Sequence, residues 1–287
     1  RMRLLWFIAV IVTVGANKCI WYEECGGNRN CFYDGPPKTL SDSSALASLL
    51  EICPQFPRGE NNTVNVCCDA NQVRTLGKQI LTMKALVSRC PACYRSLRTI
   101  ICGISCEPTQ GSYMLVDKTI EVHPDKLAVT ELTMAISRKY LQRVIDSCRD
   151  VQGILGSALN ALCLTSNCTP EALIKSLTNE NLGAPAKYNS IVTDDESVEV
   201  NQIVLRPYSS NTFNCSQSVS NELETFEPCS CADCQSACPV YSFTDPKEEK
   251  VGSVSIVVFI MIILTIFAVI MAFGLICHNV IRTLRTN

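Results

Sequence analysis

The sequence has 287 residues, a formal net charge of −2, a hydrophobic fraction of 47% and 19 cysteines. This charge supplies no basic surface, which argues against a nucleic-acid-binding protein. The stretch between the two apolar ends is long enough for one domain with a sizeable core, and it contains no visible internal repeat.

The amino terminus has the pattern of a secretory signal. Arg1 and Arg3 precede an apolar run over residues 4–14, and small residues follow at Gly15 and Ala16. The alternative is a membrane anchor, but the run is shorter than the ~20 apolar residues that a spanning helix needs. We therefore expect a signal peptide over residues 1–16 that is removed from the mature chain.

Turns and then helices follow the signal. Residues 19–37 combine three cysteines with glycine and proline, which predicts loops held by disulfides. Apolar residues at helical spacing predict helices over residues 43–53, 69–87 and 128–148, the last being the most amphipathic. Strand patterns are fewer: residues 114–117 and 118–123 resemble a short hairpin, and residues 198–205 partly alternate. The predicted fold class is α+β, helix-rich, with a small mixed sheet.

The carboxy-terminal part changes character. Residues 239–253 are polar and predict a linker, whereas residues 254–277 contain no charged side chain and are long enough to cross a bilayer. Arg282 and Arg285 follow this run without any acid, so residues 278–287 are expected in the cytosol. The protein is thus predicted to be a single-pass membrane chain, with residues 17–238 in a lumenal or extracellular domain.

Cysteine usage supports this topology. All cysteines except Cys277 lie between Cys19 and Cys238, and an even set in an oxidising compartment predicts nine disulfides. Zinc binding is the alternative for the C-x-x-C pairs at Cys90 and Cys231. With only two histidines in the chain, we expect no metal. Sequons at Asn61, Asn167 and Asn214 predict glycosylated surface loops.

Catalysis is not indicated. The predicted domain has a single histidine, His123, and no nucleophile-elbow, phosphate-loop or zincin motif occurs. We expect neither an enzyme nor a cofactor.

A binding pocket leaves a different pattern, namely polar residues on an apolar helix face. Gln72, Thr75, Leu76 and Gln79 are spaced i, i+3, i+4 and i+7, so they share one face. The alternative is that Asp69 and Gln72 form a capping box at the helix start. From the pattern alone, capping is the favoured interpretation.

Four motifs identify a resemblance to a known family. They are Cys19-Ile-Trp-Tyr-Glu-Glu-Cys25-Gly, Tyr33-Asp-Gly-Pro-Pro-Lys38, Cys67-Cys-Asp and Ser88-Arg-Cys-Pro-Ala-Cys93. In order and spacing the chain resembles the amino-terminal domain of the Niemann-Pick type C1 family, over residues 19–238. The resemblance implies a lumenal domain that binds cholesterol or another sterol and passes it toward the membrane region of a transporter. It also implies that the sequence is a fragment, with its ectodomain in the lumen of late endosomes or lysosomes or outside the plasma membrane.

The resemblance further implies site residues. Asn30 and Gln72 would hold the sterol hydroxyl directly and Glu24 would reach it through water. The implied pocket wall consists of Trp21, Thr75, Leu76, Gln79, Ile101 and Ile145, and the implied entrance of Ala161, Leu162, Pro185 and Ala186. Ala161 and Ala186 replace larger family residues, so the mouth is expected to differ, and with it docking of the soluble Niemann-Pick type C2 carrier. A disulfide-rich receptor or adhesion ectodomain that binds a protein is the alternative function.

The same resemblance implies the disulfide pairing. The pairs are Cys19–Cys67, Cys25–Cys31, Cys53–Cys102, Cys68–Cys106, Cys90–Cys229, Cys93–Cys148, Cys163–Cys168, Cys215–Cys234 and Cys231–Cys238.

Overall fold

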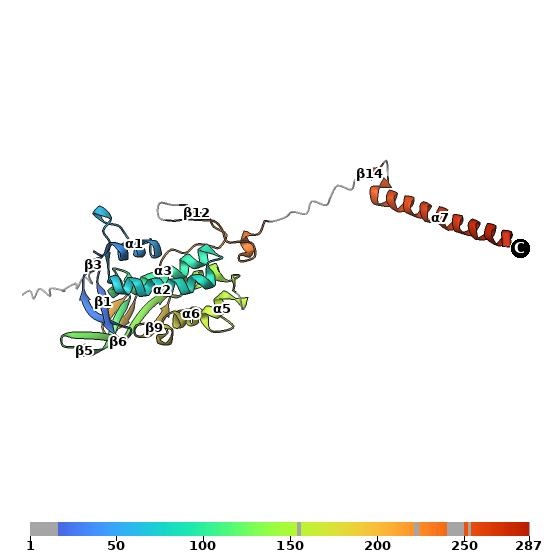
Figure 1. Cartoon of the computed structure of the whole chain (residues 1–287). Coiled ribbons are helices and arrows are strands. Elements are labelled where there is room, and N and C mark those ends of the chain that lie inside the picture. Colours follow the sequence, from blue (N-terminus) through green and yellow to red (C-terminus); the bar gives the residue numbers. More distant parts are fainter. Residues whose placement is uncertain (1–16, 154–155, 221–223, 240–249, 252–253, 287) are drawn as a thin grey trace, which may run out of the picture. The chain divides into compact units, whose positions relative to one another are not determined.

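The computed structural model describes residues 17–153, 156–220, 224–239, 250–251 and 254–286 (Figure 1). The expected signal peptide, residues 1–16, lies outside the described residues, as does most of the expected linker. The chain divides into two compact units, Arg1–Cys238 and Pro239–Asn287.

A five-stranded mixed sheet forms the base of the first unit. Its strands are β1 (Cys19–Gly26), β2 (Arg29–Gly35), β5 (Met114–His123), β6 (Lys126–Ser137) and β9 (Lys187–Thr193). The order is β1-β2-β6-β5, all antiparallel, and β9 runs parallel to β6 with Leu132 opposite Tyr188. β6 is therefore the strand that joins the two halves of the sheet.

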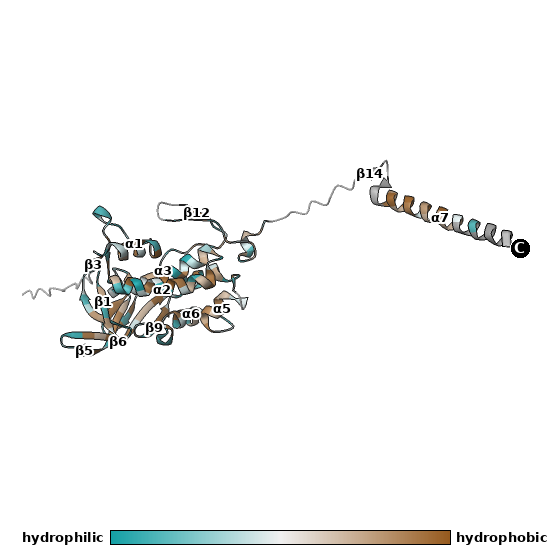
Figure 2. Ribbon diagram, viewed as in Figure 1, coloured by the Kyte–Doolittle hydropathy of each residue, from teal (hydrophilic) through white to brown (hydrophobic). Residues whose placement is uncertain are grey.

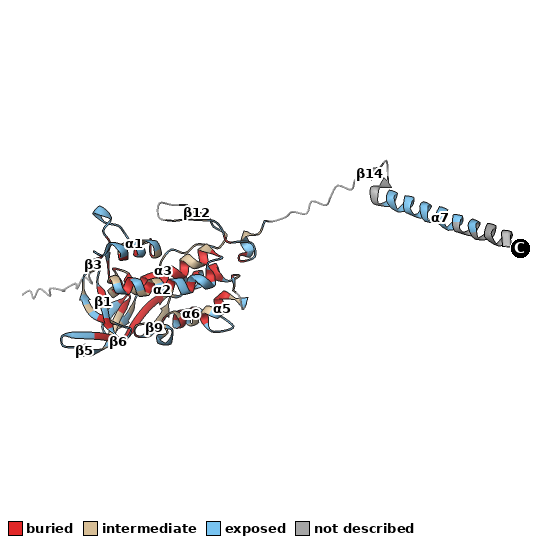
Figure 3. Ribbon diagram, viewed as in Figure 1, coloured by how far each residue is buried: buried red, intermediate tan, exposed pale blue. Residues whose placement is uncertain are grey.

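Helices pack against this sheet and enclose the core. They are α1 (Ser43–Ile52), α2 (Ala70–Val87), α3 (Pro91–Cys106), α4 (Arg138–Cys148), α5 (Ala158–Cys163) and α6 (Pro170–Leu177). Leu76 and Ile80 of α2, Ile100 of α3 and Leu132 and Met134 of β6 are fully buried in one core cluster. Figures 2 and 3 show apolar and buried positions along α2 and α3, although α3 also buries the polar side chains of Ser96, Arg98 and Thr99.

Short elements complete the unit. The strand pairs are β3 (Lys38–Thr39) with β4 (Asn65–Val66), β7 (Gln152–Gly153) with β8 (Gly156–Ser157), β10 (Val198–Val200) with β11 (Ile203–Leu205), and β12 (Val219–Ser220) with β13 (Thr225–Phe226). The 3₁₀ turns are η1 (Glu60–Asn62), η2 (Gln110–Ser112), η3 (Glu180–Leu182) and η4 (Gln235–Ala237). The α+β, helix-rich fold class is confirmed.

The predicted helix over residues 128–148 is wrong in its first half. Residues up to Ser137 belong to β6, and only then does α4 begin, with the Ser137 hydroxyl accepting from the N–H of Tyr140 at 3.3 Å. The β-branched residues in this stretch, such as Val129 and Ile136, favour a strand. Pairing with β5 on one side and β9 on the other decides between the two structures.

Three other local predictions need correction. Residues 19–37, expected as loops, form the β1–β2 hairpin with Gly27 and Asn28 at positive φ in its turn. Residues 114–123 form one strand, and its turn lies beyond it, where Asp125 has a φ of 67°. Residues 198–205 form a hairpin, since Asn201 and Gln202 both have positive φ, as a tight two-residue turn requires.

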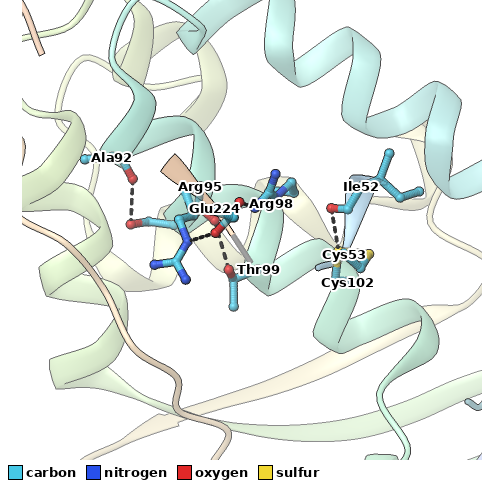
Figure 4. A network of polar contacts seen from close by, with 9 residues as sticks. Ile52, Cys53, Ala92, Arg95, Arg98, Thr99, Cys102 and Glu224 are labelled. Carbon is cyan, nitrogen blue, oxygen red and sulfur yellow. Dashed lines mark hydrogen bonds and ion pairs between the residues drawn. A yellow bond between two sulfur atoms is a disulfide. The ribbon is translucent and has the colours of Figure 1, made fainter. Parts of the chain in front are cut away.

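Nine disulfides hold the first unit together, and they are the nine pairs that the family resemblance implies. The carboxy-terminal strands of the unit are also held by charge. Glu224 forms ion pairs with both Arg95 and Arg98 of α3 (Figure 4). These contacts fasten the last strand pair to the helical layer.

The second unit contains the pair β14 (Lys250–Val251) and β15 (Val254–Ser255) and the helix α7 (Ile256–Thr286). The side chains of α7 are described at positions 258–274 and 278, and most of them are apolar (Figure 2). Over the described residues, no helix combines the length and the apolarity that a bilayer span requires. The transmembrane assignment stays a prediction.

Candidate functional site

A pocket opens between the β1–β2 hairpin, the helices α2 and α3 and the segment that leads into β9. The free space inside it is about 70 Å³. Nine of the expected site residues line it: Trp21, Glu24, Asn30, Gln72, Thr75, Leu76, Gln79, Ile101 and Pro185. These residues come from five separate elements or loops, so only the folded chain brings them together.

Gln72 lies in the pocket wall and is only 6% exposed. Its Oε1 accepts hydrogen bonds from the backbone N–H groups of Asp69, at 2.9 Å, and Glu23, at 3.0 Å. Both partners are donors, so the carbonyl oxygen must occupy this position and the amide orientation is fixed. The Nε2 group is buried without a hydrogen-bond partner among the described residues.

The capping box predicted at the start of α2 is present, because Asp69 accepts from the Gln72 N–H at 2.9 Å. The second donor to Gln72 comes from an irregularity of β1, where Glu23 adopts a φ of 70°. Capping and facing the pocket are therefore not alternatives. The oxygen of the Gln72 amide caps the helix, and the same residue lines the pocket.

Glu24 and Asn30 lie opposite each other on the β1–β2 hairpin. The Glu24 carboxylate accepts a hydrogen bond from the Thr75 hydroxyl at 2.8 Å, which joins the hairpin to α2. The polar end of the pocket is thus built from an acid, two amides and a hydroxyl.

The rest of the wall is mainly apolar. Trp21 is fully buried, and its indole nitrogen donates to the carbonyl of Ser105 at 3.2 Å. Leu76 and Ile101 face the same space. The wall thus combines apolar side chains with the polar groups of Glu24, Asn30, Gln72 and Thr75.

A second hollow adjoins the pocket. It encloses about 440 Å³ and shares four wall residues with the pocket: Gln79, Ile101, Leu177 and Ala184. We call it the outer groove. Its other walls include Ala161 and Leu162 and the exposed Leu86, Leu164 and Leu182.

Two expected site residues lie elsewhere. Ile145 of α4 and Ala186 before β9 are buried in the core cluster and do not line the pocket or the groove. α4 presents Ile145 to the core, and Ala186 is 2% exposed just ahead of the strand pairing. The pocket wall in this structure therefore does not include Ile145 or Ala186.

Comparison with known proteins assigns the chain to a family. The family model described as "Niemann-Pick C1 N terminus" matches residues 16–259. The chain belongs to the Niemann-Pick C1 family. It is 31% identical over 250 residues to the NPC intracellular cholesterol transporter 1 of Sus scrofa, and the aligned region covers 82% of this chain and 19% of that protein. It is 26% identical over 289 residues to the NPC1-like intracellular cholesterol transporter 1 of Homo sapiens, and that alignment covers 88% of this chain and 20% of the relative. The chain thus spans about a fifth of the length of these relatives.

Both Niemann-Pick C1 relatives are named as cholesterol transporters and not as enzymes. Within the described ranges, no group of three or more His, Cys, Asp and Glu side chains is placed to hold a metal ion. The sequon residues Asn61, Asn167 and Asn214 are all exposed, as a glycan requires. Their modification stays a prediction.

Sequence reasoning missed seven wall residues in this Niemann-Pick C1 chain: Asn28, Ile104, Ser105, Leu177, Gly183, Ala184 and Tyr188. Ile104 and Ser105 lie on α3, a helix that was not predicted. Tyr188 lies on β9, whose sequence Lys-Tyr-Asn-Ser-Ile-Val-Thr lacks a clear alternation of apolar and polar residues. Only the pairing of β9 with β6 reveals its position.

Proposed function

We propose that this chain binds cholesterol or a related sterol through its hydroxyl group in the pocket between β1, α2 and α3. The observation that carries the proposal is the Nε2 of Gln72, a pocket residue, which is buried and has no hydrogen-bond partner in the described part of the chain. A buried donor without a partner costs about 1 to 3 kcal/mol, and an alcohol oxygen in the pocket would remove that cost. Asn30 and Glu24 lie in the same wall and are able to complete the hydrogen bonding of one hydroxyl.

The size of the ligand sets a second requirement. A pocket of about 70 Å³ is too small for a sterol of about 28 heavy atoms, since ligand sites of this class enclose roughly 300 to 1,000 Å³. The outer groove supplies about 440 Å³ and shares a wall with the pocket. We therefore propose that sterol entry joins the two spaces, with the hydroxyl inside and the hydrocarbon tail in the groove.

Different groups are expected to supply the binding free energy and the selectivity for sterols. At roughly 0.3 kcal/mol per heavy atom, a sterol of this size binds with about 8 kcal/mol, in the micromolar range. Burial of the apolar rings supplies nearly all of it. The hydroxyl bond contributes only about 1 kcal/mol net, but a hydrocarbon without that group leaves Gln72 unpaired. The polar end selects alcohols and orients them.

The proposal also includes the cellular location of the domain and the transfer of the sterol. We propose that residues 17–238 lie in the lumen of late endosomes or lysosomes or outside the cell, and that residues 254–277 anchor them in the membrane. The sterol would then pass toward the membrane region of a transporter. A soluble carrier of the Niemann-Pick type C2 kind would dock at the outer groove, where Leu164 and Leu182 are exposed.

Substituting Gln72 tests the proposal. Gln72→Met keeps the length of the side chain and removes both polar atoms, so it weakens the helix cap as well as the pocket. Asp69→Ala is the matched control, because it breaks the other half of the capping box and Asp69 does not line the pocket. Both variants should lose about 1 kcal/mol of stability.

Only Gln72→Met should lower the binding of radiolabelled cholesterol, by roughly 5- to 100-fold for a buried polar partner. Asp69→Ala should bind cholesterol as the wild type does. Equal cholesterol binding by the wild type and Gln72→Met would refute the role of the amide.

A further inference from the structure

A further cleft lies between α6 and β9, which pack against each other (Figure 1). It encloses about 550 Å³, and we call it the α6 cleft. On the helix its wall is formed by Glu171, Ile174, Lys175 and Thr178. Their spacing of i, i+3, i+4 and i+7 places them on one helix face. The cleft therefore follows α6 from its first turn to Thr178, the residue that caps its carboxy-terminal end.

The opposite wall contains two hydroxyl groups without a partner. Tyr188 and Ser190 are two residues apart on β9, so their side chains leave the strand on the same face, and both line the α6 cleft. Each hydroxyl oxygen is buried and has no hydrogen-bond partner in the described part of the chain. By contrast, the buried Tyr113 hydroxyl donates to the carbonyl of Gly103 at 2.7 Å. Because an unpaired buried hydroxyl is costly, two of them in one wall indicate an occupant that supplies polar atoms.

The charges of the described wall cancel. Two acidic and two basic side chains line the α6 cleft: Glu171, Glu180, Lys175 and Lys187. This balance gives no net attraction for an anion or a cation. Asn179 and Asn181 add amide groups to the wall, and Ile174 and Val192 add apolar surface. A neutral molecule with many hydroxyl groups and an apolar face, that is, a sugar, fits a wall of this kind.

A predicted glycosylation site lies at one end of the α6 cleft. Asn167 is exposed and lies four residues before Glu171, the first wall residue on α6. Four residues span at most about 14 Å, so a sugar chain on Asn167 begins within that distance of the cleft. The disulfide between Cys163 and Cys168 holds the loop that carries Asn167 close to α5 and α6. The innermost sugars of an N-linked glycan are neutral and rich in hydroxyl groups, as the wall requires.

We infer that the α6 cleft holds the innermost sugars of a glycan on Asn167, with the Tyr188 and Ser190 hydroxyls as hydrogen-bond partners. The first sugar is joined through its anomeric carbon to the side-chain nitrogen of Asn167. This inference rests on the predicted modification of Asn167 and is independent of sterol binding. Because Ser176 and Leu177 of α6 line the outer groove, the bound glycan also stiffens one wall of that groove.

Enzymatic release of the glycans from the folded, full-length glycoprotein tests the inference. An endoglycosidase that cuts between the first two sugars is added, and mass spectrometry of peptides follows each sequon separately. Asn61 and Asn214 are controls on the same molecule, since neither lines the α6 cleft. Ser190→Ala and Tyr188→Phe each remove one of the two hydroxyls, and thermal unfolding checks that both variants fold.

We expect the glycan on Asn167 to be cleaved roughly 10- to 30-fold more slowly than those on Asn61 and Asn214, the effect of two hydrogen bonds. Each variant should speed cleavage at Asn167 about fivefold and leave the control sites unchanged. Equal rates at all three sites, or slow cleavage at Asn167 that neither variant changes, would overturn the inference. An Asn167 that carries no glycan after secretion would do the same. None of these results bears on sterol binding, so the proposed function is tested separately.

Discussion

Gln79 donates a hydrogen bond from Nε2 to the carbonyl oxygen of Gly183, 3.2 Å away. Gln79 lies on α2 and lines both the pocket and the outer groove, whereas Gly183 follows η3 and has a φ of 99°. The bond therefore ties the helix to the loop before β9, where the two spaces meet.

Breaking this bond should make sterol exchange faster. Gln79→Met keeps the side-chain length and removes the donor, so opening no longer costs a hydrogen bond worth about 1 kcal/mol. We expect association and dissociation rates to rise about fivefold, with little change in affinity. Stopped-flow measurement with a fluorescent sterol checks this. Thr82→Val is the control, since Thr82 lines the groove and its hydroxyl donates to the carbonyl of Lys78 within α2.

Two helical glycines should respond to alanine in opposite directions. A Cβ on Gly103 would lie 2.4 Å from the Tyr208 hydroxyl oxygen, whereas a Cβ on Gly77 meets nothing within 4 Å. Gly77→Ala should stabilise the fold by about 0.5 to 1 kcal/mol, because alanine has the better helix propensity. Gly103→Ala should destabilise it by about 1 to 3 kcal/mol through overpacking. Urea unfolding measures both, and a stabilised Gly103→Ala would contradict the packing described here.

Glu107 should make stability depend on pH. Burial raises the pKa of its carboxyl from 4.5 to about 7, with a smaller opposing effect of a hydrogen bond to Thr109. The folded state then holds a proton that the unfolded state releases between these values. The contribution of Glu107 to stability should be greatest below about pH 4.5 and fall, by up to about 3 kcal/mol, as pH rises to 7.

Glu107→Gln remains neutral and should lack that fall. Thermal unfolding from pH 4 to 8 compares the two proteins. A wild type and a variant with parallel pH profiles would show that Glu107 is not the responsible group.

The Glu224 ion pairs should contribute more than a surface pair does. The side chains of Glu224, Arg95 and Arg98 are 14%, 15% and 8% exposed. Glu224→Gln leaves two shielded guanidinium groups without their counter-charge, which should cost about 2 to 4 kcal/mol. Glu171→Gln is the control, because its pair with Arg138 is about half exposed and should cost less than about 1 kcal/mol. Equal effects in chemical unfolding would contradict this account.

Local pattern predicted the helix α2 and its capping box, because both depend on residues close in sequence. It did not predict β6, where pairing with β5 and β9 overrides a helix-like pattern. The family resemblance implied most of the residues that the pocket gathers. Gln72 was predicted as a helix cap or a pocket residue, and the structure shows both, since its oxygen accepts from Asp69 and Glu23 and the residue lines the pocket. The sequence did not predict Tyr188 as a wall residue, since its place in the wall depends on the register of β9.

A structure of this chain with bound cholesterol tests the central claim most directly. The account predicts the sterol oxygen about 3 Å from Nε2 of Gln72, with the rings along Trp21 and Leu76 and the tail in the outer groove. A sterol bound with its hydroxyl toward the groove, or bound away from this pocket, would contradict it.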